Sequence, residues 1–205
     1  GRFWVHPSIW KDIDYESNSI RPNFEVNLAG NPWIVLCKEG FFLDKIIECT
    51  QGLELGYNCE KQELYVTIRL EFVPETNVIV QKNTIKNYGK RNCKLTRFSS
   101  CFMEHIASDN KENWYDNNEL YVYICHSKWM GEGQWRKYKP TELGLYPGSV
   151  HGAEKASYRI NSIGSWSTAG FYPMTVVEDK KHGNVWYMEI EGSHNWFLQY
   201  DAYGG

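Results

Sequence analysis

The feature of this sequence that most constrains its fold is the segment 63–72, in which polar and apolar residues alternate. The residues on the apolar side of this alternation are Leu64, Val66, Ile68, Leu70 and Phe72. Successive side chains of a β-strand point to opposite faces of its sheet. The segment therefore predicts an antiparallel strand that buries one face and leaves the other half open.

Further strands are predicted on both sides of this one. Pro74 ends the strand, and the β-branched run at 78–80 starts another that continues towards Ile85. The turn residues of 87–92 then lead into a strand over 94–102, which predicts a meander of three adjacent strands. Two less regular stretches, 20–36 and 41–57, are also strand-like.

The C-terminal part of the chain shows the same signals. Strands at 174–178 and 184–190 flank the turn-rich segment 179–183, which predicts a hairpin. A further strand is predicted where Trp196, Leu198 and Tyr200 share one face. Only 142–146 suggests a helical turn, while 105–119 and 138–157 are polar or rich in Gly and Pro and predict long connections.

Composition supports the same fold class. Aromatic residues make up 16% of the 205 residues, and aromatic and β-branched side chains favour pleated surfaces. The hydrophobic share of 42% and the charged share of 23% exclude a disordered chain. We therefore predict an all-β chain, an antiparallel β-super-sandwich of two stacked sheets with little helix, which forms a single domain over 1–205.

Charge and cysteine content limit the partners and the compartment. With 22 basic and 25 acidic residues the net charge is −3, which argues against a nucleic-acid partner, and the lack of a long apolar run argues against a membrane. The six cysteines would allow disulfides but show no zinc-type spacing, so we expect reduced, mostly buried thiols in a cytoplasmic protein, with no metal and no cofactor. The glycines at both ends indicate a segment excised from a larger protein.

The first group of candidate site residues lies within 126–135 and comprises Trp129, Glu132, Gln134 and Trp135. Indole faces stack on the C–H patches of sugar rings, and carboxylate and amide groups bind sugar hydroxyls. The alternative is that both indoles pack in a core or an interface and that the neighbouring glycines form a β-bulge.

The second group is centred on Trp166 in 162–168. Neither Ser165 nor Ser167 has the glycines of a nucleophile elbow, so we expect these hydroxyl residues to bind backbone groups. The acidic residues that share a strand face, Glu189 with Glu191 and Glu63 with Glu71, are typical of solvated faces. No residue of this chain is therefore predicted to be catalytic.

In several ordered motifs the chain resembles one subgroup of the family 36 glycoside hydrolases. The motifs are His126-x-x-Trp129-x-Gly131-Glu132-Gly133-Gln134-Trp135, Leu143-Gly144-Leu145-Tyr146-Pro147, Gly164-Ser165-Trp166-Ser167-Thr168 and Val185-Trp186-Tyr187-Met188-Glu189-Ile190-Glu191. The run at 78–80 and the turn at Asn87 also match. The resemblance covers residues 60–200, whereas 1–50 match less clearly.

Enzymes of this family are typically retaining α-galactosidases, and the resemblance assigns this chain to their N-terminal β-super-sandwich. It implies that a catalytic (β/α)8 barrel of the same polypeptide carries both catalytic aspartates, so this chain alone is expected to be inactive. The implied role in carbohydrate metabolism is to dock onto the barrel, support a homo-oligomer or form the rim of a galactoside pocket. Trp129, Glu132, Gln134, Trp135 and Trp166 are the candidates for that rim or interface.

Two other functions stay open. Exposed tryptophans on a sandwich also suit a carbohydrate-binding module or a lectin-like protein. A self-contained hydrolase would need its own pair of carboxylates across a cleft, which nothing in the sequence indicates. An excised domain is further expected to expose an apolar surface and to self-associate.

Overall fold

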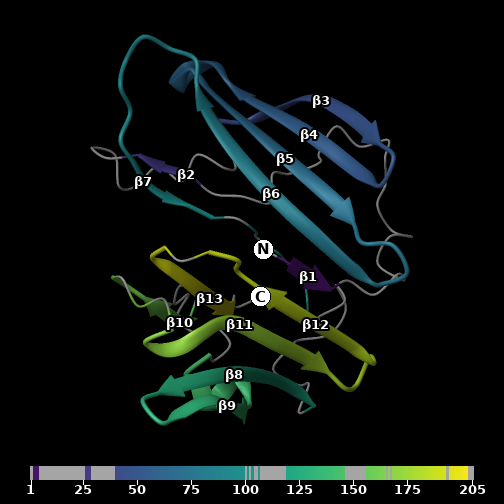
Figure 1. The fold of residues 1–205 in the computed structure, drawn as a ribbon, viewed down its shortest axis with the longest axis vertical. Coiled ribbons are helices and arrows are strands. Elements are labelled where there is room, and N and C mark those ends of the chain that lie inside the picture. Colours follow the sequence, from purple (N-terminus) through teal and green to yellow (C-terminus); the bar gives the residue numbers. More distant parts are fainter. Residues whose placement is uncertain are drawn as a thin grey trace, which may run out of the picture. The chain divides into compact units, whose positions relative to one another are not determined.

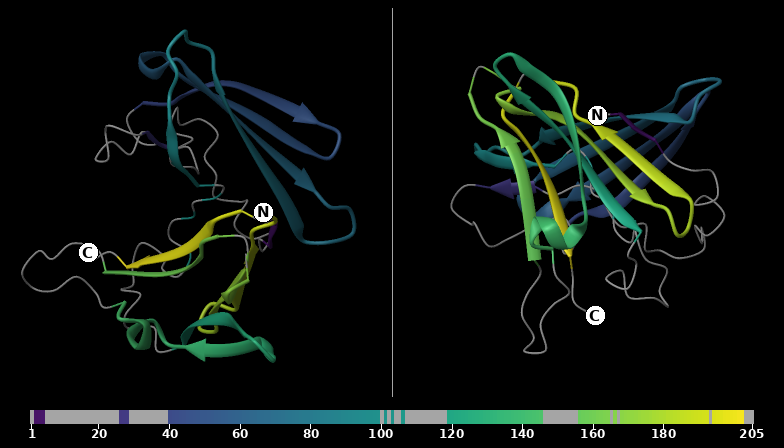
Figure 2. Two further views of the ribbon diagram at one scale, coloured as in Figure 1. Left: turned by 60° about the vertical axis from the view of Figure 1, so that its left-hand side comes forward. Right: turned by 90° about the horizontal axis from the view of Figure 1, so that it is seen from below.

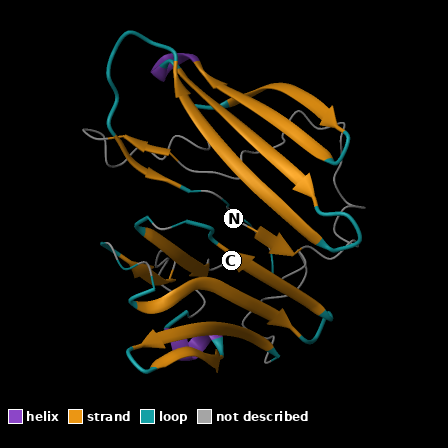
Figure 3. Ribbon diagram, in the orientation of Figure 1, coloured by secondary structure: helices purple, strands orange, loops and turns teal. Residues whose placement is uncertain are grey.

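A computed structural model describes residues 2–4, 26–28, 40–99, 101, 103, 106, 119–145, 156–164, 166, 168–192 and 194–202. Within these residues the chain consists of antiparallel strands and two short 3-10 turns (Figure 3). The predicted all-β, antiparallel fold with little helix is therefore confirmed. Most of 20–36, 105–119 and 146–155 lies outside the described residues.

The chain forms two compact units. Unit 1 comprises Gly1 and residues 7–104, and unit 2 comprises residues 2–6 and 105–205. Each unit has a hydrophobic core of its own between two layers of strands. The single domain expected over 1–205 stays a prediction.

Unit 1 contains a four-stranded antiparallel sheet covered by a two-stranded ribbon (Figure 1). The sheet has the order β3 (Phe42–Cys49), β4 (Gly52–Cys59), β5 (Leu64–Phe72) and β6 (Val78–Asn87). The ribbon pairs β2 (Val26–Leu28) with β7 (Leu95–Phe98). A 3-10 turn, η2 (Glu60–Gln62), joins β4 to β5.

The alternation that predicted β5 also accounts for the core of unit 1. Leu64, Val66 and Ile68 are buried and pack with Val26 of the ribbon and Tyr57 of β4. The opposite face of β5 stays partly open. The sequence pattern therefore predicted both the strand and the face that it buries.

The predicted three-stranded meander is wrong in its last strand. The pair β5–β6 forms as expected, but β7 pairs with β2 and not with β6. The connection 88–94 is too long for a tight hairpin, which leaves the chain free to cross to the second layer. Asn87 fixes the start of this connection, because its side chain donates to the carbonyl of Arg91 at 2.8 Å and accepts from the amide of Gly89 at 2.9 Å.

Unit 2 repeats this layered plan with a larger sheet (Figures 1 and 2). The sheet has the order β1 (Arg2–Trp4), β12 (Asn184–Glu189), β11 (Gly170–Asp179), β8 (Leu120–Lys128) and β9 (Gly131–Tyr138). The second layer is the ribbon of β10 (Ala156–Ser162) and β13 (Trp196–Ala202). The core between the layers contains Val122, Ile124, Leu143, Leu145, Ile160, Trp196 and Ala202.

Most of the C-terminal predictions are confirmed. The hairpin forms between β11 and β12, and the strand with Trp196, Leu198 and Tyr200 is β13. The helical turn is present as η4 (Pro140–Leu143), two residues earlier than expected. The strands β8 and β9 over 120–138 were not predicted from the sequence, because 126–135 was considered as a group of site residues and not as part of a hairpin.

Candidate functional site

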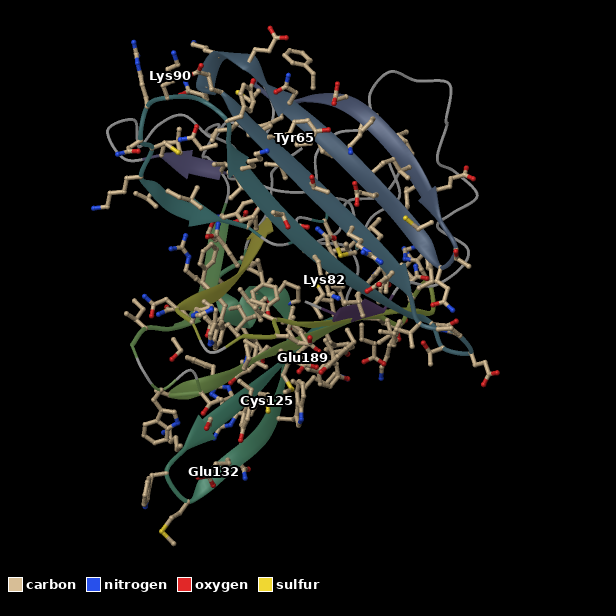
Figure 4. All side chains as sticks on the ribbon, turned by 45° about the horizontal axis from the view of Figure 1, so that its top comes forward. Tyr65, Lys82, Lys90, Cys125, Glu132 and Glu189 are labelled. Atoms are coloured by element: carbon tan, nitrogen blue, oxygen red, sulfur yellow. The ribbon has the colours of Figure 1, made fainter. Side chains whose placement is uncertain are left out.

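The β8–β9 hairpin holds four of the five predicted site residues. Its turn is formed by Trp129 and Met130, between the paired residues Lys128 and Gly131. Met130 has a φ of 59°, a left-handed conformation that a long side chain rarely adopts. Figure 4 shows Glu132 near the outer end of this hairpin, away from Cys125 in the body of β8. Both Glu132 and Gln134 are exposed.

A β-bulge divides the predicted site between two faces of the sheet. The pairing shifts between His126 and Lys128, and Gly133 takes a φ of 70° that favours glycine. Beyond the bulge Gln134 lies opposite His126, whereas Trp135 lies opposite Cys125. Because neighbouring residues of a strand point to opposite faces, Gln134 and Trp135 do not share a surface.

The structure brings Trp129 and Trp166 together from two separate motifs. Their ring centroids lie 6.4 Å apart at an interplanar angle of 89°, which is an edge-to-face pair. The side chains of Trp129 and Trp166 are 79% and 53% exposed. Neither Trp129 nor Trp166 therefore packs in the core of this unit.

Local hydrogen bonds hold Trp166 in place. The indole Nε1 of Trp166 donates to Oγ1 of Thr168 at 3.0 Å, and its carbonyl accepts from Oγ of Ser162 at 2.7 Å. The predicted role of these hydroxyl residues in binding backbone groups is thus confirmed at Ser162. The same loop is fixed to the end of the β10–β13 ribbon, because the amide of Gly164 donates to Oδ1 of Asn195 at 2.8 Å.

The residues beside the two indoles are apolar and exposed. Met130, next to Trp129 in the hairpin turn, is 89% exposed, and Ile163, in the loop of Trp166, is 77% exposed. We call Trp129, Met130, Ile163 and Trp166 the tryptophan tip. Exposed aromatic and Met side chains that gather in this way are typical of surfaces that bind another protein.

Trp135 belongs to a different surface, the face of the unit 2 sheet that points away from the core. Its indole is 45% exposed. Along β9 the next residue on this face is Lys137, which lies opposite Tyr123. Tyr121 of β8 and Glu178 of β11 are also paired across strands on this face. We call Trp135, Lys137, Tyr121, Tyr123 and Glu178 the Trp135 face.

The polar groups of the Trp135 face form one network. The phenol of Tyr123 donates to Oε2 of Glu178 at 2.5 Å, and Nζ of Lys137 lies 3.8 Å from the same oxygen. Nζ of Lys137 also lies 3.6 Å from the centroid of the Tyr121 ring. The hydrogen bond to Glu178, together with partial burial, raises the pKa of Tyr123.

His126, on the opposite face of β8, is a structural residue. Its Nε2 lies 2.9 Å from the phenol oxygen of Tyr138, and its ring lies 5.1 Å from the ring of Phe171. Burial lowers the pKa of His126, and the positive charges of Arg136 and Lys128 lower it further. The imidazole is therefore neutral at pH 7 and packs between aromatic rings.

The acidic residues considered for catalysis take part in local contacts. Glu189 accepts a hydrogen bond from the phenol of Tyr187 at 2.7 Å. Glu71 lies 3.1 Å from Arg69 and 3.3 Å from Lys82. In the part of the chain that the structure describes, no group of three or more His, Cys, Asp or Glu could hold a metal ion.

The prediction that the cysteines are mostly buried holds for only some of them. The described cysteines, Cys49, Cys59, Cys93, Cys101 and Cys125, are all free. Cys59 and Cys125 are buried as expected, but Cys49 and Cys93 are exposed. Burial raises the pKa of the Cys125 thiol, which lies opposite Trp135 on the same face of the sheet.

Sequence reasoning missed four residues of the Trp135 face: Tyr121, Tyr123, Lys137 and Glu178. A signal was present, because Tyr121 and Tyr123 alternate with the buried Leu120, Val122 and Ile124. This period-two pattern predicts one aromatic and one aliphatic face. The pairing with Lys137 and Glu178 depends on strand order, which a local pattern does not contain.

Among the described residues, none of the helical segments has the length and apolar character needed to cross a membrane. Comparison of the chain with known protein families, with curated proteins and with solved structures gave no match.

Proposed function

We infer that this chain is a non-catalytic domain of an α-galactosidase-like glycoside hydrolase, and that it docks onto a catalytic (β/α)8 barrel through the tryptophan tip. The observation that carries this proposal is the exposed pair of Trp129 and Trp166. These two residues come from two of the motifs that resemble family 36, and they meet at one end of unit 2. The resemblance supports the enzyme class, and the exposure of the two indoles supports their use as a docking surface.

The chemistry of the tip favours a protein partner over a sugar. A sugar ring needs an indole face together with hydrogen-bonding groups for its hydroxyls. The indoles of the tip instead stand beside Met130 and Ile163, and Nε1 of Trp166 already binds Thr168. Burying each of these large apolar side chains against a partner would contribute about 1.5–3 kcal/mol.

The proposal leaves the hydrolytic step to the barrel. Retaining hydrolysis requires a nucleophile and an acid/base carboxyl at a defined separation across a sugar. Two of the acidic residues considered in this chain, Glu71 and Glu189, are instead bound to neighbouring side chains. The domain would dock onto the barrel and either support an oligomer of the enzyme or form part of the rim of its sugar pocket. The enzyme would act in carbohydrate metabolism in the cytoplasm.

Hydrolysis by the isolated chain tests this proposal. Incubation of the 205-residue chain with an aryl α-galactoside is expected to release no phenol above the rate without protein. Turnover that co-purifies with the chain, and that is lost when one of its own acidic residues is replaced by the amide, would contradict the proposal.

A carbohydrate-binding module or lectin-like sandwich is the second candidate. A separate observation favours this second candidate. Polar and aromatic groups share a sheet face with Trp135, and this face does not include the tryptophan tip.

A further inference from the structure

We propose that the Trp135 face is a binding site for a neutral oligosaccharide. The inference goes beyond docking through the tryptophan tip, because it uses a different surface of unit 2 and none of the tip residues. It depends on three properties of the face: its strand register, its fixed polar groups and the exposed indole beside them.

Strand register places the five side chains on one surface. Lys137 of β9 lies opposite Tyr123 of β8, which lies opposite Val176 of β11. Tyr121 of β8 lies opposite Glu178 of β11 in the same way. Adjacent strands are about 4.8 Å apart, and residues two apart along one strand are separated by about 7 Å. Trp135, opposite Cys125, lies two such steps from the level of Tyr121 and Glu178, so the five side chains span about 14 Å along the strands and about 10 Å across them, which is the scale of a short oligosaccharide.

The polar groups are held in place before any ligand binds. Glu178 is fixed by the phenol of Tyr123 and by Lys137, whose ammonium group is in turn held over the Tyr121 ring. Nζ of Lys180 lies 5.5 Å from the centroid of the Tyr121 ring, which is a second cation contact of that ring. Preorganised groups bind with a smaller loss of side-chain entropy than mobile ones.

Each of these groups keeps hydrogen-bonding capacity for a ligand. An ammonium group has three donors, and a carboxylate has about four acceptor positions, so neither is saturated by the contacts described. Adjacent hydroxyl groups of a sugar fit this pair, because one donates to Glu178 while the other accepts from Lys137. The charges of Glu178 and Lys137 offset each other, so the pair presents an acceptor and a donor that suit the uncharged hydroxyl groups of a neutral sugar.

The indole of Trp135 supplies the apolar half of the site. It is partly exposed and stands one same-face position from Lys137 along β9. In an oligosaccharide, one pyranose ring can stack on this indole through its C–H patches while a neighbouring ring places its hydroxyls at the Lys137–Glu178 pair. Both halves of the site are needed for affinity.

The test is a titration of the full 205-residue chain with raffinose and with galactose, followed by intrinsic tryptophan fluorescence and by calorimetry. A saturable change is expected for the unmodified chain. Trp135→Ala and Glu178→Gln should each weaken the affinity at least tenfold, whereas Tyr88→Ala, which truncates a similarly exposed aromatic side chain of unit 1, should leave it unchanged.

Glu178→Gln separates binding from folding, because glutamine preserves the size of the side chain and its bond with Tyr123. Near-ultraviolet circular dichroism confirms the fold of each variant before titration. The proposal would be overturned by a flat titration with both neutral sugars, or by saturable binding that Glu178→Gln does not weaken. Neither result depends on α-galactoside turnover, so failure of this site is distinguishable from failure of the proposed function.

Discussion

At the scale of single residues, buried polar groups fix the turns and strands that carry the candidate surfaces. Asp179, at the end of β11, is 2% exposed and binds the turn that follows it. Its Oδ2 lies 2.7 Å from Nδ1 of His182, and its Oδ1 accepts from the backbone amide of His182 at 3.3 Å. The pair of Asp179 and His182 is thus explained by turn formation, and it needs no catalytic role.

Replacing Asp179 is expected to destabilise unit 2. Asp179→Ala removes the acceptor of two hydrogen bonds at a buried position, so the free energy of unfolding should fall by about 1–3 kcal/mol. Urea denaturation followed by tryptophan fluorescence measures the change. Glu132→Ala, which truncates an exposed carboxylate of the β8–β9 hairpin, is the matched control and should change stability by less than about 0.5 kcal/mol. Equal effects of the two variants would refute this role of Asp179.

A buried phenol links the stability of unit 1 to alkaline pH. Burial raises the pKa of Tyr57 from 10.0 to about 12, so the folded chain holds this proton more tightly than the unfolded chain does. The stabilisation of the folded chain that results is complete below pH 10. It is lost as the pH rises towards 12, at a slope of up to about 1.4 kcal/mol per pH unit. Tyr57→Phe should flatten this slope between those limits in denaturation experiments. An unchanged slope would show that Tyr57 does not titrate differently on unfolding.

At the scale of elements, local patterns predicted strands and hairpin partners well, but they did not predict the partner of β7. The alternation of 63–72 and of 196–200 identified β5, β13 and their buried faces, because period two is a property of the strand itself. The partner of β7 was predicted wrongly, since the path of the 88–94 connection is set by tertiary packing and by Asn87. The bulge at Gly133 was considered, but its consequence, the separation of Gln134 from Trp135, follows only from the register of β8 and β9.

Close packing between β4 and β5 makes one glycine indispensable. A Cβ atom at Gly52 would lie 1.9 Å from the carbonyl oxygen of Leu70, a backbone atom that a side-chain rearrangement does not move. Gly52→Ala is therefore expected to lower the free energy of unfolding by about 1–3 kcal/mol or more. At Gly131, where the nearest atoms would be 3.9 Å away, the same replacement should be tolerated. Comparison of the two denaturation midpoints checks the prediction, and similar midpoints would contradict it.

At the scale of the whole molecule, the chain exposes two kinds of apolar surface. The tryptophan tip belongs to unit 2, whereas β3 of unit 1 is a strand whose residues are all exposed and which, among the described strands of unit 1, pairs only with β4. Phe42, Ile46 and Ile47 of β3 are the large apolar side chains of this strand that face solvent most. Open strand edges pair with other chains, so β3 is a competing source of self-association.

The candidate surfaces themselves were only partly predictable. Trp129 and Trp166 were identified because Trp, Gly and Ser cluster around them in the sequence, but nothing local indicated that the two indoles would meet. Lys137 and Glu178 were missed because they join Tyr123 only through the order of β9, β8 and β11. Contacts between distant segments decide which predicted residues form one surface.

The measurement that tests the docking role of the tryptophan tip most directly is sedimentation velocity over a wide range of concentration. The unmodified chain is expected to associate beyond its monomer mass of 24.0 kDa, and Trp129→Ala combined with Trp166→Ala is expected to suppress this association. Ile47→Lys, which places a charge on the open strand β3, should leave most of the association in place. A chain that stays monomeric throughout, or an association that Ile47→Lys abolishes and the double tryptophan variant does not, would contradict this docking role.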